Sequence, residues 1–315
     1  MKRTLRLRPL LKRLLQIAGI LIIAQSIVDY RRSRAPQTTP PPTNNPPVTR
    51  DQKVFIASIH WNNEKILRSH WIPALLDLVS HLGEKNVYVS VQESGSWDDS
   101  KGALRELDAA LGERGVRRRI VLDETTHADE IGKTPAADGW IRTSRSETKE
   151  LRRVPYLAKL RNLVLEPLEE LARGEEGEVF ERVVWLNDVV FTVCTDSLPM
   201  HSISTRSMAD VFFAFSFFQT QDVQRLLDTR GGDYAAACSL DFSKPPAFYD
   251  TFALRDSDGH AAVMQSWPYF RSKASRDALK ASEPVPVTSC WNGMGSYNIH
   301  TPPRSPHFHD SARGH

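Results

Sequence analysis

The stretch Val183–Phe191, which reads VVWLNDVVF, decides the fold that we predict for this chain. β-Branched and aromatic residues surround one polar pair, Asn187 and Asp188, and this pattern is typical of a buried strand that ends in a polar site. In open α/β sheets, ligands bind outside the carboxyl ends of the strands, so Asp188 is well placed to hold a metal ion or a substrate. The alternative is a strand followed by an ordinary Asx turn.

The segments around this strand alternate between strand-like and helix-like patterns. Alternating strands and helices predict an α/β fold, in which a mostly parallel sheet has helices on its faces. Pro167 should kink or restart the last of these helices. The expected strands are Lys53–Ile59, Asn86–Gln92, Arg119–Leu122 and Val183–Phe191, and the expected core-facing helical stripes run over Leu67–Leu82, Leu104–Leu111 and Leu157–Leu171.

Composition narrows the class of protein. The 315 residues, 40% of them hydrophobic, suffice for one large α/β domain or two small ones. The net charge of +3 is unevenly spread, because residues 1–34 hold nine basic residues and one acid. A mildly acidic body behind a basic tail argues against a nucleic-acid-binding protein. The three cysteines, Cys194, Cys238 and Cys290, predict neither a disulfide framework nor paired metal ligands.

The N-terminal region predicts a membrane anchor. Leu14–Val28 contains no charge, and six basic residues before it and three after it favour a cytosolic N-terminus. A cleaved signal peptide is the alternative, but no small-x-small cleavage site follows the segment. The span is shorter than the ~20 residues of an average bilayer, which suits a thin early-secretory membrane. We expect a cytosolic tail (1–13), a transmembrane signal anchor (14–28), a Pro-rich stem (29–52) and a lumenal domain (53–294).

Seven ordered motifs in that domain resemble the fungal α-1,3-mannosyltransferase family related to the capsule-associated proteins, glycosyltransferase family 69. Their order and spacing, rather than any single motif, carry the resemblance. They are IHWNNE (59–64), QESGSWDD (92–99), LAKLRN (157–162), WLNDVVF (185–191), GGDYAAACSLDF (231–242), FYDTFALRDSDG (248–259) and PVPVTSCWNGM (284–294).

The resemblance implies a type II enzyme of the Golgi or endoplasmic reticulum with a nucleotide-sugar-binding α/β fold of the GT-A type. Such an enzyme transfers mannose from GDP-mannose to a glycan hydroxyl with retention, and uses Mn²⁺ or Mg²⁺. Loss of the diphosphate requires charge neutralisation, which a carboxylate-held divalent ion and a cationic side chain provide. Asp188, with Asn187 as a weaker oxygen ligand, resembles the family's metal-diphosphate motif, although the pair is not Asp-x-Asp.

Further candidates follow from chemistry and from the same resemblance. Arg161 and Asn162 would contact the diphosphate or ribose, since a planar guanidinium binds phosphate in bidentate fashion; the alternative is a solvated helix face. Three more groups are expected near the nucleotide or the sugars, and their alternatives are a plain turn, a salt-bridged loop and a Trp that fills the core. They are Glu93, Ser94, Gly95, Ser96 and Asp98 for the nucleotide pocket, Trp291 and Asn292 for a sugar ring, and Asp241, Asp250, Arg255 and Asp256 for sugar hydroxyls and charge, with Asp241, Arg255 and Asp256 as the catalytic candidates.

Two segments depart from the family pattern. Residues 193–221 separate the strand from the next motif, begin with Val-Cys and end with Gln, and we interpret them as an intron translated in frame. Residues 295–315 no longer resemble the family, and we expect a disordered or aberrant tail. A non-catalytic membrane-anchored component of polysaccharide assembly or export is therefore the second hypothesis, and transfer of another nucleotide sugar is the third.

Overall fold

The structure of this chain is a computed structural model, and it divides into two compact units. One unit comprises Thr43–Ser239 with Trp291–His315, and the other comprises Met1–Pro42 with Leu240–Cys290. The expected stem, most of the anchor, the expected insert 193–221, Asp250 and Asn292 lie outside the described residues. The structure describes residues 13, 16–21, 24, 52–125, 129, 140–142, 149–151, 153–175, 177–190, 222–244, 247–248, 252–261, 267–291 and 293–299.

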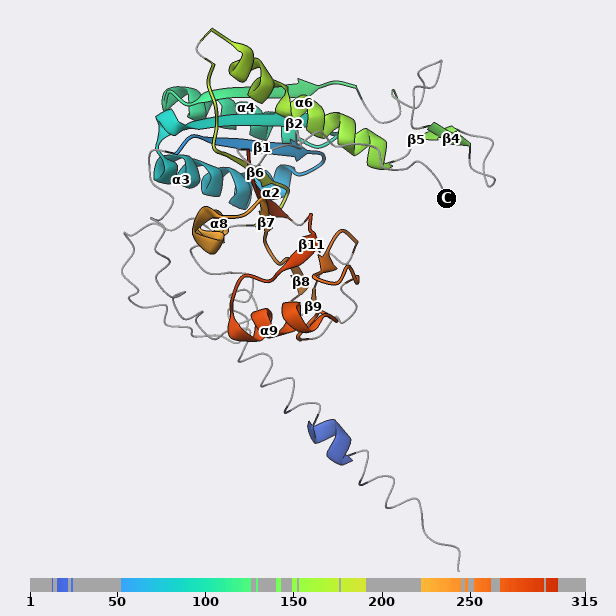
Figure 1. Cartoon of the computed structure of the whole chain (residues 1–315). Coiled ribbons are helices and arrows are strands. Elements are labelled where there is room, and N and C mark those ends of the chain that lie inside the picture. The colour runs from blue at the N-terminus through green and yellow to red at the C-terminus, as the bar shows by residue number, and fades with distance from the viewer. Residues whose placement is uncertain are drawn as a thin grey trace, which may run out of the picture. The chain divides into compact units, whose positions relative to one another are not determined.

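The larger unit contains a six-stranded sheet with the strand order β3-β2-β1-β6-β12-β7. The first four strands in that order are parallel, and β12 runs antiparallel to both of its neighbours. The predicted α/β fold with a mostly parallel sheet and flanking helices is thereby confirmed (Figure 1). The strands are β1 (Val54–His60), β2 (Val87–Ser94), β3 (Arg117–Asp123), β6 (Arg182–Leu186), β7 (Ala236–Cys238) and β12 (Met294–Asn298), and β4 (Trp140–Arg142) pairs separately with β5 (Lys149–Leu151).

Helices cover both faces of this sheet because each strand buries alternate residues on opposite sides. One face packs its Val54 and Ile56 against the apolar stripes of α3 and α4. The other face packs Phe55 and Ala57 against α6, which contains Pro167 and continues through it. The helices of this unit are α2 (Glu64–Ile66), the π-helical η1 (Leu67–Trp71), α3 (Ile72–Leu82), η2 (Glu84–Asn86), α4 (Ser100–Glu113), α6 (Arg153–Arg173), α8 (Asp222–Leu227) and η4 (Thr229–Gly232).

The strand that decides the fold is shorter than predicted. β6 ends at Leu186, so the polar pair follows its carboxyl end directly and Val189 and Val190 lie outside the strand. The chain leaves the ladder here because the Val189 amide donates to the Asn187 carbonyl, which forms a turn. The prediction of a buried strand followed by the polar pair is confirmed, and its extension to Phe191 is wrong for Val189 and Val190.

The prediction of a disordered tail over residues 295–315 is wrong for residues 295–298, because these residues belong to β12. This strand pairs with β6 on one side and with β7 on the other. Its sequence, MGSYN, lacks the alternation that identifies a strand. Hydrogen bonds from two neighbouring strands, together with the buried Met294 and Ser296, hold it in the sheet instead.

The smaller unit has its own core, in which Leu254, Tyr269 and Phe270 are buried. A correction concerns the cysteines, since Cys238 and Cys290 are both disulfide-bonded. Three cysteines distant in sequence give no signal of disulfide bonding, because spacing alone does not show which thiols are oxidised. The elements of this unit are β8 (Phe242–Lys244), β9 (Ala247–Phe248), β10 (Arg255–Asp256), α9 (Lys273–Ala281) and β11 (Val287–Ser289).

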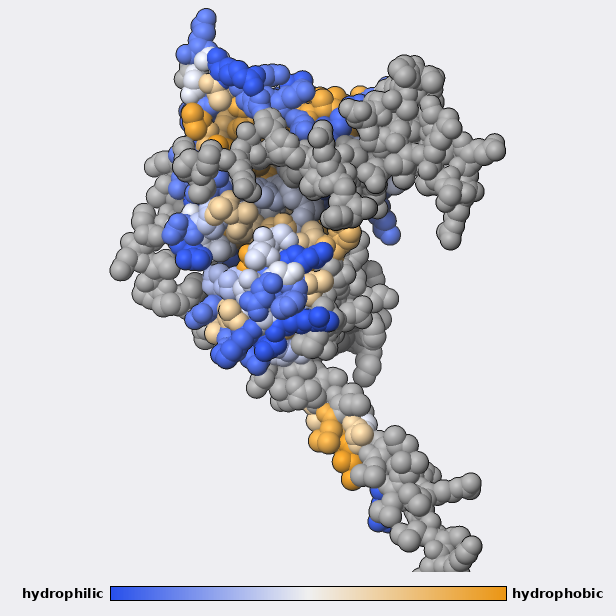
Figure 2. Space-filling model, turned by 45° about the vertical axis from the view of Figure 1, so that its right-hand side comes forward, coloured by the Kyte–Doolittle hydropathy of each residue, from blue (hydrophilic) through white to orange (hydrophobic). Residues whose placement is uncertain are grey.

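The N-terminal segment is described only in part. Residues 16–21 and 24 are helical, and apolar side chains of this segment are exposed, as the hydrophobic colour in Figure 2 shows. None of the helices among the described residues is long and apolar enough to cross a membrane. The predicted anchor over residues 14–28 therefore stays a prediction.

Candidate active site

Three loops meet at one edge of the sheet. β1, β2 and β6 run parallel, so the residues that follow His60, Ser94 and Leu186 emerge at the same side. Ligands of open α/β sheets bind at this edge, where the carboxyl ends of the strands open into loops. We refer to the segments 61–63, 95–99 and 187–188 as the first, second and third loops.

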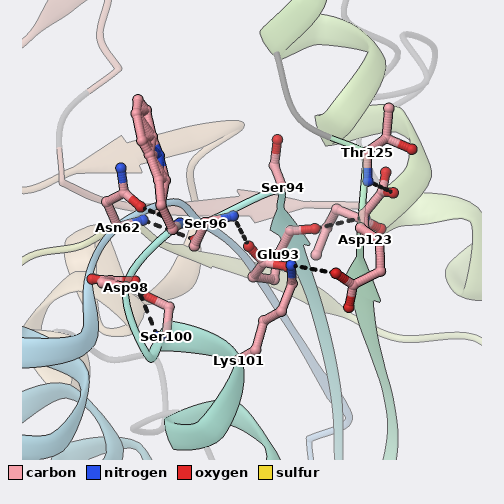
Figure 3. A network of polar contacts seen from close by, with 12 residues as sticks. Asn62, Glu93, Ser94, Ser96, Asp98, Ser100, Lys101, Asp123 and Thr125 are labelled. Carbon is pink, nitrogen blue, oxygen red and sulfur yellow. Dashed lines mark hydrogen bonds and ion pairs between the residues drawn. The ribbon is translucent and has the colours of Figure 1, made fainter. Parts of the chain in front are cut away.

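Asn62 joins the first loop to the second. Its backbone amide donates to Ser96 Oγ at 2.9 Å, and its side-chain Oδ1 accepts from the Trp97 amide at 2.9 Å. Its φ of 51° is a left-handed conformation, which only a few per cent of non-glycine residues adopt. Asn tolerates that conformation better than most residues, and the two hydrogen bonds hold it there (Figure 3).

Asn63 joins the first loop to the third. Its backbone amide donates to Ser100 Oγ at 2.8 Å, which attaches it to the start of α4. Its side-chain Nδ2 donates to Asp188 Oδ2 at 2.9 Å. The Asp188 carboxylate, which is exposed, is thus oriented by a residue 125 positions earlier in the chain.

Asp98 organises the ends of two helices. Its carboxylate accepts from the Glu64 amide, at the start of α2, and from the amide and hydroxyl of Ser100, at the start of α4. Burial by itself would raise the pKa of Asp98, but the hydrogen bonds from Ser100 and Glu64 together lower it. A negative charge next to two helix N-termini is also favourable electrostatically. Asp98 therefore shapes the expected nucleotide pocket by fixing its loops.

Glu93 supports the second loop from inside the protein. Its side chain is 0% exposed, its Oε1 accepts from the Ser96 amide, and Lys101 Nζ lies 3.8 Å from its Oε2. Gly95 has a φ of 63°, so a residue with a Cβ would be strained in this turn. Ser94 is also buried, and its hydroxyl lies within hydrogen-bonding distance of the Tyr156 hydroxyl on α6. Of the nucleotide candidates, Ser96 and Asp98 reach the surface, while Glu93 and Ser94 are enclosed.

Three hydrogen bonds hold Asn187 in place. Its side-chain Oδ1 accepts from Trp185 Nε1 at 2.9 Å, and its carbonyl accepts from Trp71 Nε1 at 3.0 Å. Its amide donates to the Gly293 carbonyl at 2.8 Å. These contacts direct the Asn187 side chain toward Trp185, whereas its neighbour Asp188 reaches the surface.

His60, the second residue of the motif IHWNNE, is a site residue that the sequence does not single out. It is the last residue of β1, it is buried, and its Nε2 lies 2.9 Å from Ser58 Oγ. Its ring meets the Trp71 ring edge to face, with 4.5 Å between centroids. Burial lowers the pKa of His60 to about 4, although the negative charge of Asp188 raises it. The imidazole is neutral at physiological pH, and it packs beneath the third loop.

Arg161 and Trp291, which are distant in sequence, are in contact. The guanidinium carbon of Arg161, on α6, lies 4.1 Å from the centroid of the Trp291 ring, a cation–π arrangement. The Trp291 ring in turn lies 5.4 Å from that of Trp185, whose indole holds Asn187. A chain of contacts therefore connects the positive charge of Arg161 to the third loop. Asn162 is half-buried next to it on the same helix.

The predicted catalytic residues Asp241, Arg255 and Asp256 belong to the smaller unit. Asp256 is 0% exposed, and its carboxylate accepts from the backbone amides of Asp258, His260 and Ser272. Burial would raise the pKa of Asp256, but these amides and His260 together lower it. Arg255 donates to two backbone carbonyls of its own loop, and Asp241 is half-buried. The contacts of Asp256 are those of a residue that fixes a turn and the start of α9.

A divalent ion would find oxygen ligands at this edge of the sheet, but few of them. Within the described residues, no group of three or more His, Cys, Asp or Glu side chains could hold a metal ion. Asp188 offers an exposed carboxylate, and the Asn187 oxygen already accepts the Trp185 indole proton. This edge therefore fits an ion held by one carboxylate that takes its remaining ligands from water and from a bound diphosphate, as Mg²⁺ commonly does.

The fold and this edge define the class of protein. Polar loops after successive parallel strands, with the oriented carboxylate of Asp188 among them, lie where open α/β sheets bind their ligands. The chain belongs to the family described as Cryptococcal mannosyltransferase 1, whose model matches residues 53–200 and 198–313. It is therefore a member of a mannosyltransferase family, as the seven motifs predict.

The match also corrects one expectation. The family resemblance does not end at Met294, because the second matched segment continues to residue 313. The two matched segments meet at residues 198–200, inside the segment 193–221 that the sequence presents as an insert. Neither the curated proteins nor the solved structures contain a match to this chain.

Proposed function

We propose that this protein is an α-1,3-mannosyltransferase that moves mannose from GDP-mannose to a glycan hydroxyl with retention of configuration. The observation that carries the proposal is the hydrogen bond by which Asn63 of the first loop orients Asp188, in a chain that belongs to a mannosyltransferase family. Hydrolysis or transfer of a nucleoside diphosphate sugar produces negative charge on the leaving diphosphate, and the enzyme must stabilise it.

In this proposal each loop has a separate task. Asp188 holds the divalent ion, Mn²⁺ or Mg²⁺, which supplies the positive charge that the leaving diphosphate requires. Asn63 keeps the carboxylate oriented through its hydrogen bond to Oδ2. Ser96 lines the side on which the nucleoside binds, and the hydrogen bonds of Asn62 to Ser96 and to the Trp97 amide keep Ser96 in place before the ligand arrives. Arg161 adds positive charge from the α6 side of the sheet.

We place the protein in the Golgi or endoplasmic reticulum membrane with its globular part in the lumen. Two observations support this location. The uncharged stretch 14–28 follows a strongly basic tail. The disulfide-bonded Cys238 and Cys290 require an oxidising compartment, and the secretory pathway provides one whereas the cytosol keeps thiols reduced.

The test is a donor assay with the full chain purified in detergent. Wild-type protein is given GDP-mannose, GDP-glucose or UDP-glucose with an α-mannose oligosaccharide and Mn²⁺, and the product is analysed for linkage and anomeric configuration. Asp188→Asn, which keeps the size of the side chain and an oxygen for Asn63, should lower transfer by roughly 10²-fold or more because it removes the charge at the ion. Val179→Ala, on the approach to β6 at its opposite end, is the control and should transfer normally.

Two outcomes would overturn the proposal. Transfer from another donor alone would reassign the sugar nucleotide. Absence of transfer by the folded wild-type chain, with no binding of GDP-mannose, would favour the hypothesis of a non-catalytic, membrane-anchored component of polysaccharide assembly or export.

A further inference from the structure

Two tryptophans lie exposed next to each other at the edge of the candidate site. Trp61, in the first loop, is 49% exposed, and Trp97, in the second loop, is 72% exposed. Their ring centroids are 5.2 Å apart and their planes are inclined by 62°. A Trp side chain can bury 150–250 Å² of surface, so leaving two of them in water forfeits a large favourable contribution to folding.

The backbone of each tryptophan is held by hydrogen bonds. The Trp61 amide donates to Asn63 Oδ1 at 2.7 Å, and the Trp97 amide donates to Asn62 Oδ1 at 2.9 Å. Asn62 itself adopts the uncommon left-handed conformation. Strained backbone conformations that the surrounding structure maintains are found at binding sites, where they orient side chains in advance. The loops therefore present the two indoles in a defined arrangement.

The same turn that carries Trp61 orients the carboxylate of the candidate site. Asn63 binds the Trp61 amide with its side-chain oxygen and Asp188 Oδ2 with its side-chain nitrogen. One amide side chain thus connects the aromatic pair to Asp188. A ligand that lies on the indoles would lie beside the group that acts on the donor.

The geometry of the pair favours a sugar ring over a flat base. The face of an indole is electron-rich and attracts the weakly positive C–H bonds that line one side of a pyranose. Two planes inclined by 62° form a bent surface, which a puckered pyranose can contact on both rings. A planar purine would stack on one ring only.

We propose that Trp61 and Trp97 form the binding platform for a pyranose of the acceptor glycan. This inference rests on the proposed function, because an acceptor site is meaningful only in a glycosyltransferase. The platform holds the acceptor next to the donor, and it takes no part in binding the nucleotide.

The experiment measures binding of two ligands separately by titration calorimetry with the full chain in detergent. The probes are α-mannotriose, for the acceptor, and GDP with Mn²⁺, for the donor. Trp97→Ala and Trp61→Ala should weaken α-mannotriose by roughly tenfold, as truncation of a central interface Trp does, and leave GDP unchanged. Trp97→Phe should restore most of the affinity, since it restores an aromatic face. Val179→Ala, which truncates another exposed apolar residue, should change neither.

The outcomes separate this inference from the proposed function. One outcome is that the wild-type chain binds GDP and transfers mannose while the tryptophan variants bind α-mannotriose normally. That outcome refutes the platform and supports the proposed mannosyltransferase activity. Weaker GDP binding in the variants would also refute it, because the indoles would then stack on the base. A wild-type chain that binds no α-mannotriose at all excludes a platform for mannose. Circular dichroism melts of the variants, whose substitutions are at exposed positions, confirm that each is folded.

Discussion

Asn63 and Asp188, separated by 125 positions in the sequence, are joined by a hydrogen bond of 2.9 Å between Nδ2 and Oδ2. This bond fixes the only carboxylate that follows β6 directly within the described residues. It also joins the first loop to the third. The candidate site is therefore defined by a contact between loops more than by any single motif.

Asn63→Ala should lower mannosyl transfer by roughly tenfold, because a carboxylate without its orienting donor samples unproductive positions. The substitution also removes the acceptor for the Trp61 amide, so a modest loss of thermal stability is expected. Steady-state kinetics with varied GDP-mannose and Mn²⁺ measure the effect. Asn63→Gln is the matched variant, since it keeps the amide but moves it outward. Unchanged kinetics in both variants would show that Asp188 needs no orientation.

Asn62 provides a test of backbone conformation. Asn62→Ala loses the acceptor for the Trp97 amide, and Ala adopts a φ of 51° less readily than Asn does. It should therefore destabilise the unit by about 1–3 kcal/mol. Asn62→Gly loses the same acceptor but adopts this φ without strain, so it should be the less destabilised of the two. Urea unfolding followed by circular dichroism gives the comparison. Equal stability of the two variants would contradict a left-handed conformation at this position.

Asp256 should make the free energy of unfolding of the smaller unit depend on pH in the acidic range. Its folded pKa is lowered, so its contribution is complete above its ordinary value of 3.8 and is lost as the pH falls through the folded pKa. Asp256→Ala leaves three backbone amides without their acceptor and should cost about 2 kcal/mol or more near neutral pH. Melting curves of both proteins between about pH 2 and 7 should converge toward the acidic end. Parallel curves would rule out the ionised carboxylate as the cause.

The disulfide-bonded cysteines predict a response to reducing agent. Peptides containing Cys238 and Cys290 should resist alkylation in the denatured chain until a reductant is added, as mass spectrometry can show. Cys238→Ser and Cys290→Ser should each lower the free energy of unfolding by about 2–4 kcal/mol. Combining the two substitutions should cost little more than either alone if the cysteines are each other's partners. Alkylation without reductant in protein purified from the secretory pathway would exclude the disulfide bond.

Local pattern was enough to predict the parallel part of the sheet. The runs that became β1 and β2 bury apolar residues, the run that became β3 packs the partly buried Ile120 and Leu122 against the core, and the stripes that became α3 and α4 recur at helical spacing. The polar pair after β6 was predictable for the same reason. β12 was not, because MGSYN carries no such pattern and depends on two neighbouring strands for its ladders.

The roles of candidate residues were harder to predict than their positions. Glu93 and Asp98 are both carboxylates at the expected edge, yet one is 0% exposed and the other binds the starts of two helices. Sequence does not give the exposure of a side chain or the identity of its hydrogen-bond donors. Trp61 and Trp97 are the opposite case. Large aromatic residues are usually buried in a core, so the sequence gives no sign that these two are exposed.

The sequence by itself determined the α/β class with its parallel strands, and the polar pair at Asn187 and Asp188. It also determined membership of the mannosyltransferase family. Periodicity and ordered motifs can be read from the chain without its tertiary structure, which is why these features were predictable. Only the tertiary structure decided which of these residues meet. The Asn63 bond to Asp188, the Arg161 contact with Trp291 and the paired indoles all join segments distant in sequence, and such contacts arise only when the strands and helices pack together.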